Sequence, residues 1–136
     1  MLKAIVSGKP IAAPRPRVTR RGQTYMPATY SKHKDSIIQV LKDTMESSNW
    51  KQGEDSPCRL SIRFIHKRPK RMHKTGGRSP KITRPDVDNL TKTVMDSIQS
   101  SGLIKDDSQI VELHVIDLYG DKDETPHTEI CLEIWK

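Results

Sequence analysis

The sequence predicts a small mixed α/β (α+β) domain, in which two helices pack on one β-sheet in the order β-α-β-α-β-β. Three observations support this fold class. A length of 136 residues suits one compact domain. Two segments repeat their apolar residues at helical spacing, and four read as strands. Because no internal repeat or linker divides the chain, one domain over residues 1–136 is expected.

The first half of the chain predicts a strand, a helix and a second strand. Residues 2–8 (LKAIVSG) read as a strand. Residues 30–48 predict an amphipathic helix, since apolar side chains recur at helical spacing. These side chains are Ile37, Ile38, Leu41 and Met45. Residues 57–66 (PCRLSIRFIH) alternate apolar and polar side chains, which predicts a half-buried strand.

The second half predicts a helix followed by two strands. The helix carries its apolar stripe on Val87, Leu90, Val94 and Ile98, and Gly102 is its candidate C-cap. Two strands are then predicted, over residues 109–119 and 127–135. The turn-forming segment GDKDETP between them predicts an antiparallel hairpin.

Two basic loops separate these elements, at residues 9–22 and 67–85. Both loops lie in the basic part of a chain whose charge is distributed very unevenly. Residues 1–85 hold 20 Lys/Arg and 5 Asp/Glu, a net +15, whereas residues 86–136 hold 4 and 12, a net −8. A basic block of this size indicates a nucleic-acid-binding surface. The alternative, clustered solubility charge, accounts poorly for it because solubility needs only a mixed surface. The composition of the second loop suggests that it becomes ordered only when an anion binds.

A pair of aspartates follows the second basic loop directly. Pro85 keeps the preceding residue out of the helical conformation, so the chain is expected to reach Asp86 extended. If residues 86–88 stay extended, Asp86 and Asp88 point to the same side while Val87 faces the core. The helix would then start near Asp88, with Asp88 or Asn89 as N-cap.

Further polar groups follow at spacings that suit a common site. Lys92 lies one helical turn beyond Asp88, and Asp96 lies two turns beyond it. The pair Asp106-Asp107 follows the end of the same helix. It can return to the start of the helix only if the next strand runs beside the segment that bears Asp86.

A site of two or three aspartates is the oxygen-only ligand set that Mg²⁺ or Mn²⁺ prefers. Acids placed beside a phosphate-binding surface would repel its ligand unless a metal ion reverses their effect. The chemistry that suits this arrangement is metal-assisted hydrolysis of a phosphodiester, with Lys92 assisting the transition state or the leaving oxygen. The alternative is that the aspartates only cap a helix and interact with its dipole.

The segments RPDVDNLTKTVMDSI and GLIKDDSQI together resemble the core motif of the RusA-type Holliday-junction resolvases. That motif reads D-x-D-N-x-x-K, then an Asp, then a DD pair. The opening segment GKPIAAPRPRVTRRG, followed by Tyr25-Met26-Pro27, is also similar to the start of many members. The resemblance covers most of the chain.

The resemblance implies a homodimeric, Mg²⁺-dependent endonuclease that binds four-way DNA junctions and makes paired nicks. It implies that Asp86, Asp88 and Asp107 bind the metal and that Lys92 is the catalytic lysine. It leaves the parts of Asp106, Asn89 and Asp96 open. The loop from Lys67 to Arg84 is longer than in compact members, so its effect on substrate choice is open too.

Bases in both loops are candidates for holding the DNA backbone without reading its sequence. They are Arg15, Arg17, Arg20, Arg21, Lys70, Arg71, Lys74, Arg78, Lys81 and Arg84. Two other functions fit the same features: a non-catalytic basic DNA-binding protein, and a metal nuclease acting on flaps or RNA.

Several other classes of protein find no support. No Gly-rich nucleotide-binding loop is present, so no nucleotide cofactor is expected. Neither a signal peptide nor an apolar run of membrane-spanning length occurs, which predicts a cytoplasmic protein with no membrane contact. Cys58 and Cys131 lack metal-ligand spacing and are expected to be free thiols.

Overall fold

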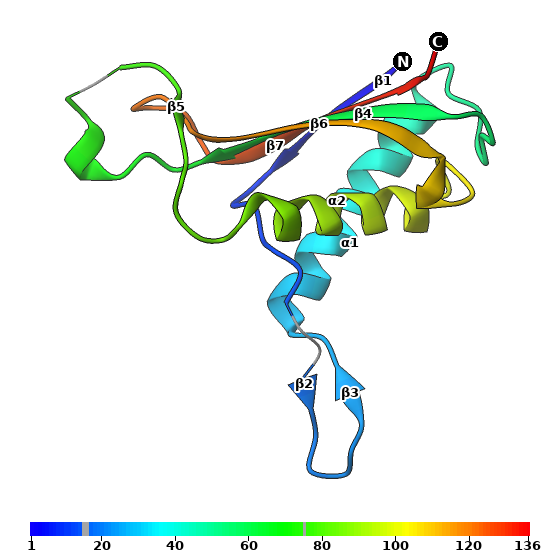
Figure 1. Cartoon of the computed structure of the whole chain (residues 1–136), viewed down its shortest axis with the longest axis horizontal. Helices are drawn as coiled ribbons and strands as arrows, with labels where there is room; N and C mark the ends of the chain where they lie inside the picture. The colour runs from blue at the N-terminus through cyan, green and yellow to red at the C-terminus, as the bar shows by residue number, and fades with distance from the viewer. Residues whose placement is uncertain (15–16, 75) are drawn as a thin grey trace.

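The computed structural model describes residues 1–14, 17–74 and 76–136, and for residues 17, 18, 24 and 25 it describes the backbone only. It contains a five-stranded mixed sheet and two long helices, which confirms the predicted fold class. Both helices lie on the same face of the sheet (Figure 1). The two chain ends meet at one end of the sheet.

The sheet is built around β4, Cys58–His66, in the order β1-β7-β4-β6-β5. β1 (Leu2–Ser7) pairs antiparallel with β7 (His127–Ile134), and β7 pairs antiparallel with β4. β6 (Ile110–Tyr119) runs parallel to β4 on its other side. β5 (Ser79–Pro80) covers only the last residues of β6, so most of β6 forms an edge of the sheet.

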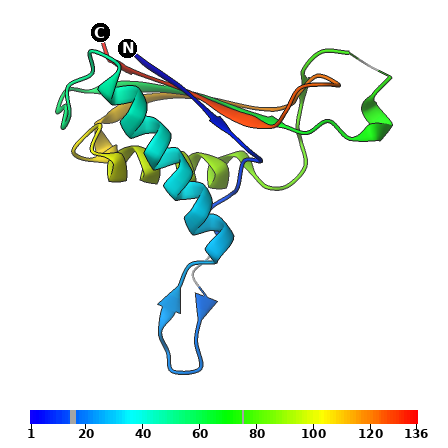
Figure 2. The same ribbon diagram turned by 180° about the vertical axis from the view of Figure 1, so that it is seen from behind.

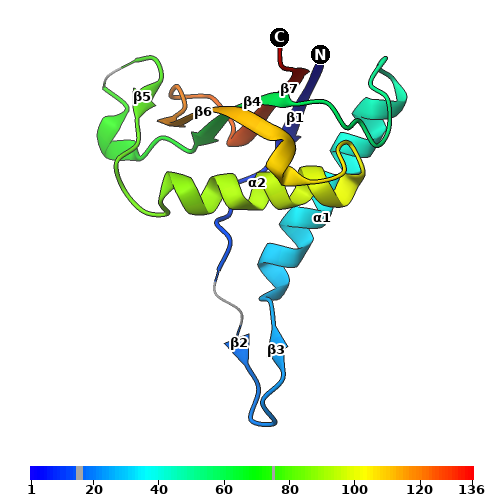
Figure 3. The same cartoon turned by 45° about the vertical axis from the view of Figure 1, so that its right-hand side comes forward.

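The two long helices cover one face of this sheet. α1 is Ala28–Glu46 and α2 is Val87–Ser101. Figure 2 shows α1 crossing the molecule in front of α2, and Figure 3 shows α2 beneath β6. Gly102 ends α2 in the left-handed conformation with φ 82°, as predicted from the sequence.

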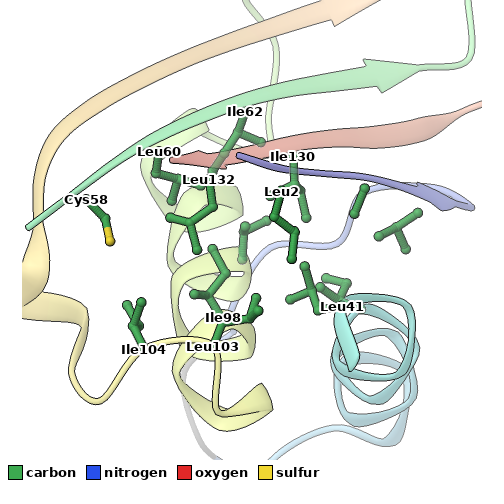
Figure 4. Close-up of a cluster of buried hydrophobic side chains, with 14 of the residues drawn as sticks. Leu2, Leu41, Cys58, Leu60, Ile62, Ile98, Leu103, Ile104, Ile130 and Leu132 are labelled. Carbon is green, nitrogen blue, oxygen red and sulfur yellow. The ribbon is translucent and has the colours of Figure 1, made fainter. Parts of the chain in front are cut away.

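The core lies between the helices and the sheet. Alternate residues of β4 point toward the helices, and the matching residues of β1 and β7 do the same (Figure 4). Leu60, Ile62, Ile98 and Leu132 are among its fully buried side chains. Apolar burial of this kind contributes about 1.5–3 kcal/mol for each large side chain, so it is the main force that fixes the helices on the sheet.

The predicted hairpin of the last two strands is wrong. β6 and β7 do not pair, because β4 lies between them. The chain crosses from β4 through α2 to β6, and a helical crossover of this kind places the next strand parallel to the first. The segment after β6 then passes the end of β4, where Gly120 donates its N–H to the carbonyl of His66 at 2.8 Å.

The start of α2 also differs from the prediction. The helix begins at Val87, and Asp86 is the N-cap with an extended backbone (φ −74°, ψ 149°). Asp88 therefore lies in the first turn and is not the cap. Val87 is 42% exposed and does not face the core. The extended segment that was to align Asp86 and Asp88 ends at Asp86, two residues earlier than expected.

Both basic loops contain short regular elements. In the first, β2 (Arg17–Val18) pairs with β3 (Thr24–Tyr25) in a hairpin that projects away from the body of the molecule (Figure 1). The second contains a 3-10 turn, η1, at Lys70–Met72, and β5. Its first arginine, Arg68, is only 2% exposed and bonds to the carbonyls of Met72, Gly77 and Gly120. The side chain of Arg68 thus connects this loop to the segment after β6, and the expectation that an anion orders the loop stays a prediction.

Candidate functional site

A pocket of about 510 Å³ lies between α2 and the edge strand β6. It contains four of the charged side chains from the aspartate-rich segments. Asp88, Lys92 and Asp96 follow one another at intervals of one helical turn, so they share one face of α2. Asp107 joins them from η2 (Asp107–Gln109), the 3-10 turn before β6. Figure 3 shows this end of β6 folding back over α2.

The return of Asp107 to α2 depends on the segment after the helix. Leu103 and Ile104 are buried and anchor that segment in the core. Asp106 then caps η2 with its side chain, which accepts a hydrogen bond from the N–H of Ser108 at 3.2 Å. The N–H of Asp107 bonds to Oε1 of Gln99 on α2 at 3.1 Å. These contacts hold Asp107 beside the helix.

Negative charge is concentrated at this end of the pocket. A hydrogen bond with Asp106 raises the pKa of Asp107 above its ordinary value. Burial and the charges of Asp106 and Asp96 act in the same direction. The pKa of Asp106 is lowered, first because its carboxylate accepts the backbone hydrogen bond of Ser108. The carboxylates of Asp96, Asp106 and Asp107 therefore repel one another.

Asp86 is placed differently from the other acids. It is exposed at the N-cap of α2, its side chain makes no capping hydrogen bond, and it is not among the residues that line the pocket. Because residue 87 is already helical, Asp86 and Asp88 do not lie on one side of an extended strand. The predicted geometric reason for pairing these two carboxylates is therefore wrong.

The donor chemistry of the pocket fits a hard divalent cation. Its possible ligands are carboxylate oxygens, and their mutual repulsion is the condition that a bound cation relieves. Within residues 1–14, 17–74 and 76–136, no three His, Cys, Asp or Glu side chains stand close enough together to hold a metal ion. The carboxylates therefore share a pocket without forming a closed ligand cage.

The turn before α2 is fixed to the end of β6. The backbone N–H of Lys81 bonds to the carbonyl of Asp117 at 3.0 Å. The Lys81 Nζ donates to the carbonyls of Thr83 and Arg84, at 2.6 and 2.9 Å. The Thr83 hydroxyl bonds to the Tyr119 hydroxyl at 2.9 Å. These bonds set where the chain enters α2, and hence where Asp86 and Asp88 lie.

The first basic loop is attached to α2 beside the acids. Ala13 donates its N–H to the carbonyl of Asn89 at 3.1 Å, and Thr93 donates its hydroxyl to the carbonyl of Ile11 at 3.0 Å. The β2–β3 hairpin leaves the molecule from this attachment. The hairpin lies on the same side of the sheet as the two helices (Figure 1).

The predicted DNA-binding bases fall into three overlapping groups. Seven are exposed, Arg78 together with Arg20, Arg21, Lys70, Arg71, Lys74 and Arg84. Two make contacts within the chain: the half-buried Lys81 bonds to backbone carbonyls, and the exposed Arg78 forms ion pairs with Glu124 and Glu129 at 2.7 and 2.8 Å. Arg15 lies outside the described residues, and only the backbone of Arg17 is described.

Sequence reasoning missed the apolar wall of the pocket, which Val87, Leu113 and Val115 form. The alternation of apolar residues along β6 predicted a strand. It gave no sign that α2 would leave the edge of β6 uncovered. It also missed Arg68, which lies among exposed bases in the sequence and has no local pattern that marks it as buried.

Comparisons with known proteins identify the family of this chain. The family model for endodeoxyribonuclease RusA matches residues 7–133, a range that includes every residue of the pocket. A relative from Bacillus subtilis (strain 168), described as uncharacterized protein YqaN, is 29% identical over 142 residues, which cover 96% of this chain and 94% of the relative. None of the described helices has the length and apolarity needed to cross a membrane. Because this family model matches nearly the whole chain, the protein belongs to the RusA family of endodeoxyribonucleases.

Proposed function

We propose that the protein is a metal-dependent endodeoxyribonuclease that resolves four-way (Holliday) junctions by paired nicks, acting as a homodimer in the cytoplasm. The observation that carries the proposal is the pocket that brings Asp88, Lys92 and Asp107 together from two separate segments. The family to which the chain belongs supports the same reaction. Asp86, Asp88 and Asp107 are the proposed ligands, and Mg²⁺ is the proposed ion, with Mn²⁺ as a substitute.

A divalent cation bound here would lower the pKa of the attacking water and neutralise charge on the phosphate. The carboxylates of Asp88 and Asp107 hold it at the pocket, and Asp86 adds a ligand from the N-cap of the same helix. The ammonium group of Lys92 is exposed, one turn from Asp88. It stabilises the negative charge that develops on the phosphate or on the leaving oxygen.

The basic loops hold the DNA next to this chemistry. The exposed bases of the hairpin and of the second loop contact phosphates without reading the base sequence. Because the loops are attached beside both ends of the Asp86–Asp88 segment, a phosphate backbone held by them is directed toward the pocket. A four-way junction has near two-fold symmetry, so a two-fold dimer presents two equivalent sites to two equivalent strands.

The test is strand cleavage by the variant Asp88→Asn, compared with the wild type on four-way, duplex and flap DNA and on RNA, each with and without Mg²⁺. We expect the wild type to nick the four-way junction only with Mg²⁺. Asp88→Asn should abolish cleavage while junction binding persists, because the amide keeps the shape of the side chain but not its charge. Asp35→Asn, at an exposed site on α1, is the matched control and should cleave normally.

Each alternative predicts a different result. A non-catalytic DNA-binding protein would show no Mg²⁺-dependent scission and no effect of Asp86→Asn. A metal nuclease with another substrate would cleave flaps or RNA in preference to the junction. Full activity of Asp88→Asn would overturn the proposed site.

A further inference from the structure

The face of the sheet opposite the helices is uncovered in the part of the chain that the structure describes (Figure 2). Because side chains alternate along a strand, the residues on this face can be identified from the strand register. Residues of β4 that point away from the helices are Arg59, Ser61 and Arg63. Their neighbours on β6 are Glu112, His114 and Ile116. The remaining members are Lys3 and Ile5 of β1, Glu129, Cys131 and Glu133 of β7, and Trp135 just after β7. These residues are called the open face below.

The open face exposes large apolar side chains. Ile5 is 66% exposed, and Ile116 and Trp135 are each 47% exposed. A groove of about 470 Å³ runs between Ile5 and Ile116, with Ser61 and Cys131 among its lining residues. Trp135 extends this surface, because its indole N–H bonds to Glu112 at 3.2 Å. Exposed apolar groups gathered on one uncovered sheet indicate a surface that another protein covers.

The charges on the open face are balanced. Three bases and three acids lie on it: Lys3, Arg59, Arg63, Glu112, Glu129 and Glu133. Arg59 pairs with Glu112 and, at 3.2 Å, with Glu133. Arg63 approaches Glu129 at 3.8 Å. The open face is therefore close to neutral, although the chain as a whole carries +7.

This balance distinguishes between the classes of partner. DNA is disfavoured because three carboxylates would face its phosphates. A strongly acidic or basic protein gains little from a neutral surface. A second copy of this chain fits, because two molecules of charge +7 repel one another least where their surfaces are neutral. A two-fold contact also brings the arginines of one copy near the glutamates of the other.

We propose that the open face is the surface through which two copies of this chain associate. The inference rests on the homodimer of the proposed function and names the surface that forms it. Neither Asp88 nor Lys92 lies on the open face, so both pockets stay accessible in such a dimer. The β2–β3 hairpin remains outside the contact, whereas the second basic loop borders it, because Arg78 forms an ion pair with Glu129 of the open face.

The test is the molar mass in solution, measured by light scattering and by sedimentation equilibrium over a range of concentrations. The wild type should have twice the chain mass of 15.5 kDa. Ile116→Glu places two like charges in the contact and should raise the dissociation constant at least about tenfold, toward monomer. Ile5→Glu tests the same face from another strand. Ile82→Glu is the control, since Ile82 is 95% exposed in the second loop and away from the open face.

Circular dichroism melting establishes that each variant is folded, and either open-face variant suffices if the other fails to fold. A wild type that stays monomeric at every concentration would overturn the inference, as would dimers of normal strength in both folded variants. The readout is independent of cleavage. A monomeric but active nuclease would refute this surface and the homodimer while leaving the proposed reaction standing, whereas a dimer through this face without cleavage activity would refute the proposed reaction alone.

Discussion

At the scale of single residues, the proposed reaction depends most directly on the charge of Lys92. Its ammonium group is exposed on α2 one turn beyond Asp88, and it lines the pocket that also contains Asp107. A positive group next to developing negative charge lowers the energy of the transition state more than that of the bound substrate. Lys92 therefore has a role that its methylene chain cannot fulfil.

We predict that Lys92→Met lowers the rate of junction cleavage by about 10²–10³-fold. Junction affinity should fall much less, because the exposed bases of the loops supply most phosphate contacts. Lys92→Arg should recover part of the rate. Single-turnover cleavage at saturating enzyme separates the rate from the affinity. Lys42→Met, an exposed position on α1, is the control. Equal activity of Lys92→Met and the control would exclude Lys92 from the reaction.

At the scale of elements, the position of Asp107 depends on how α2 ends. Gly102 takes φ 82°, a conformation that costs other residues about 1–2 kcal/mol. The chain turns there toward Leu103 and Ile104 and then reaches η2. The reversal at Gly102 thus joins the helix that carries Asp88 to the turn that carries Asp107.

We predict that Gly102→Ala lowers the free energy of unfolding by about 1–2 kcal/mol, from backbone strain alone. The added methyl group itself has room, since its nearest neighbour would be Gln52 at 3.6 Å. Urea unfolding measures the change. Gly76→Ala is the control, because Gly76 has no positive φ and no atom within 4 Å of the added carbon. A neutral Gly102→Ala would show that the end of α2 relaxes without strain.

The elements themselves were predictable because their signals are local. Apolar periodicity placed every long helix and strand within about two residues, and glycine marked the end of α2. The pairing of β6 with β4 was not predictable from a turn-rich segment, since strand pairing is decided by contacts far apart in sequence. The N-cap of α2 was placed two or three residues late, at Asp88 or Asn89 in place of Asp86, and that error alone removed the argument for aligning Asp86 with Asp88.

At the scale of the whole molecule, acids from the C-terminal strands neutralise part of the basic half. Arg78 of the second loop is held by Glu124 and Glu129, so the loop is attached to the far end of the sheet. The hydrogen bond from Arg78 lowers the pKa of Glu124 from 4.5 to about 2. A carboxyl group whose pKa is lower in the folded state stabilises the fold at pH values above its unfolded-state pKa. This contribution is lost as the pH falls through the folded-state pKa.

We predict that thermal stability decreases as the pH falls from about 4.5 to about 2, and that Glu124→Gln makes this decrease shallower. At neutral pH the same variant should melt at a lower temperature, because Arg78 loses a partner. Melting curves over this pH range provide the measurement, with Glu46→Gln at the end of α1 as control. An unchanged pH profile in Glu124→Gln would show that this ion pair is not coupled to folding.

The same pairing decides which bases are available for DNA. Arg71 is exposed in the second loop, whereas the guanidinium of Arg78 already contacts two carboxylates. Binding to phosphates releases counterions, so affinity should fall steeply as salt rises. We predict that Arg71→Gln reduces the slope of log affinity against log salt by about one, and that Arg78→Gln changes it much less. Fluorescence anisotropy with an uncleaved junction in EDTA measures both slopes.

A flat salt response of the wild type would contradict the basic-surface argument. Equal slopes for the two variants would show that the ion pairs of Arg78 open when DNA binds.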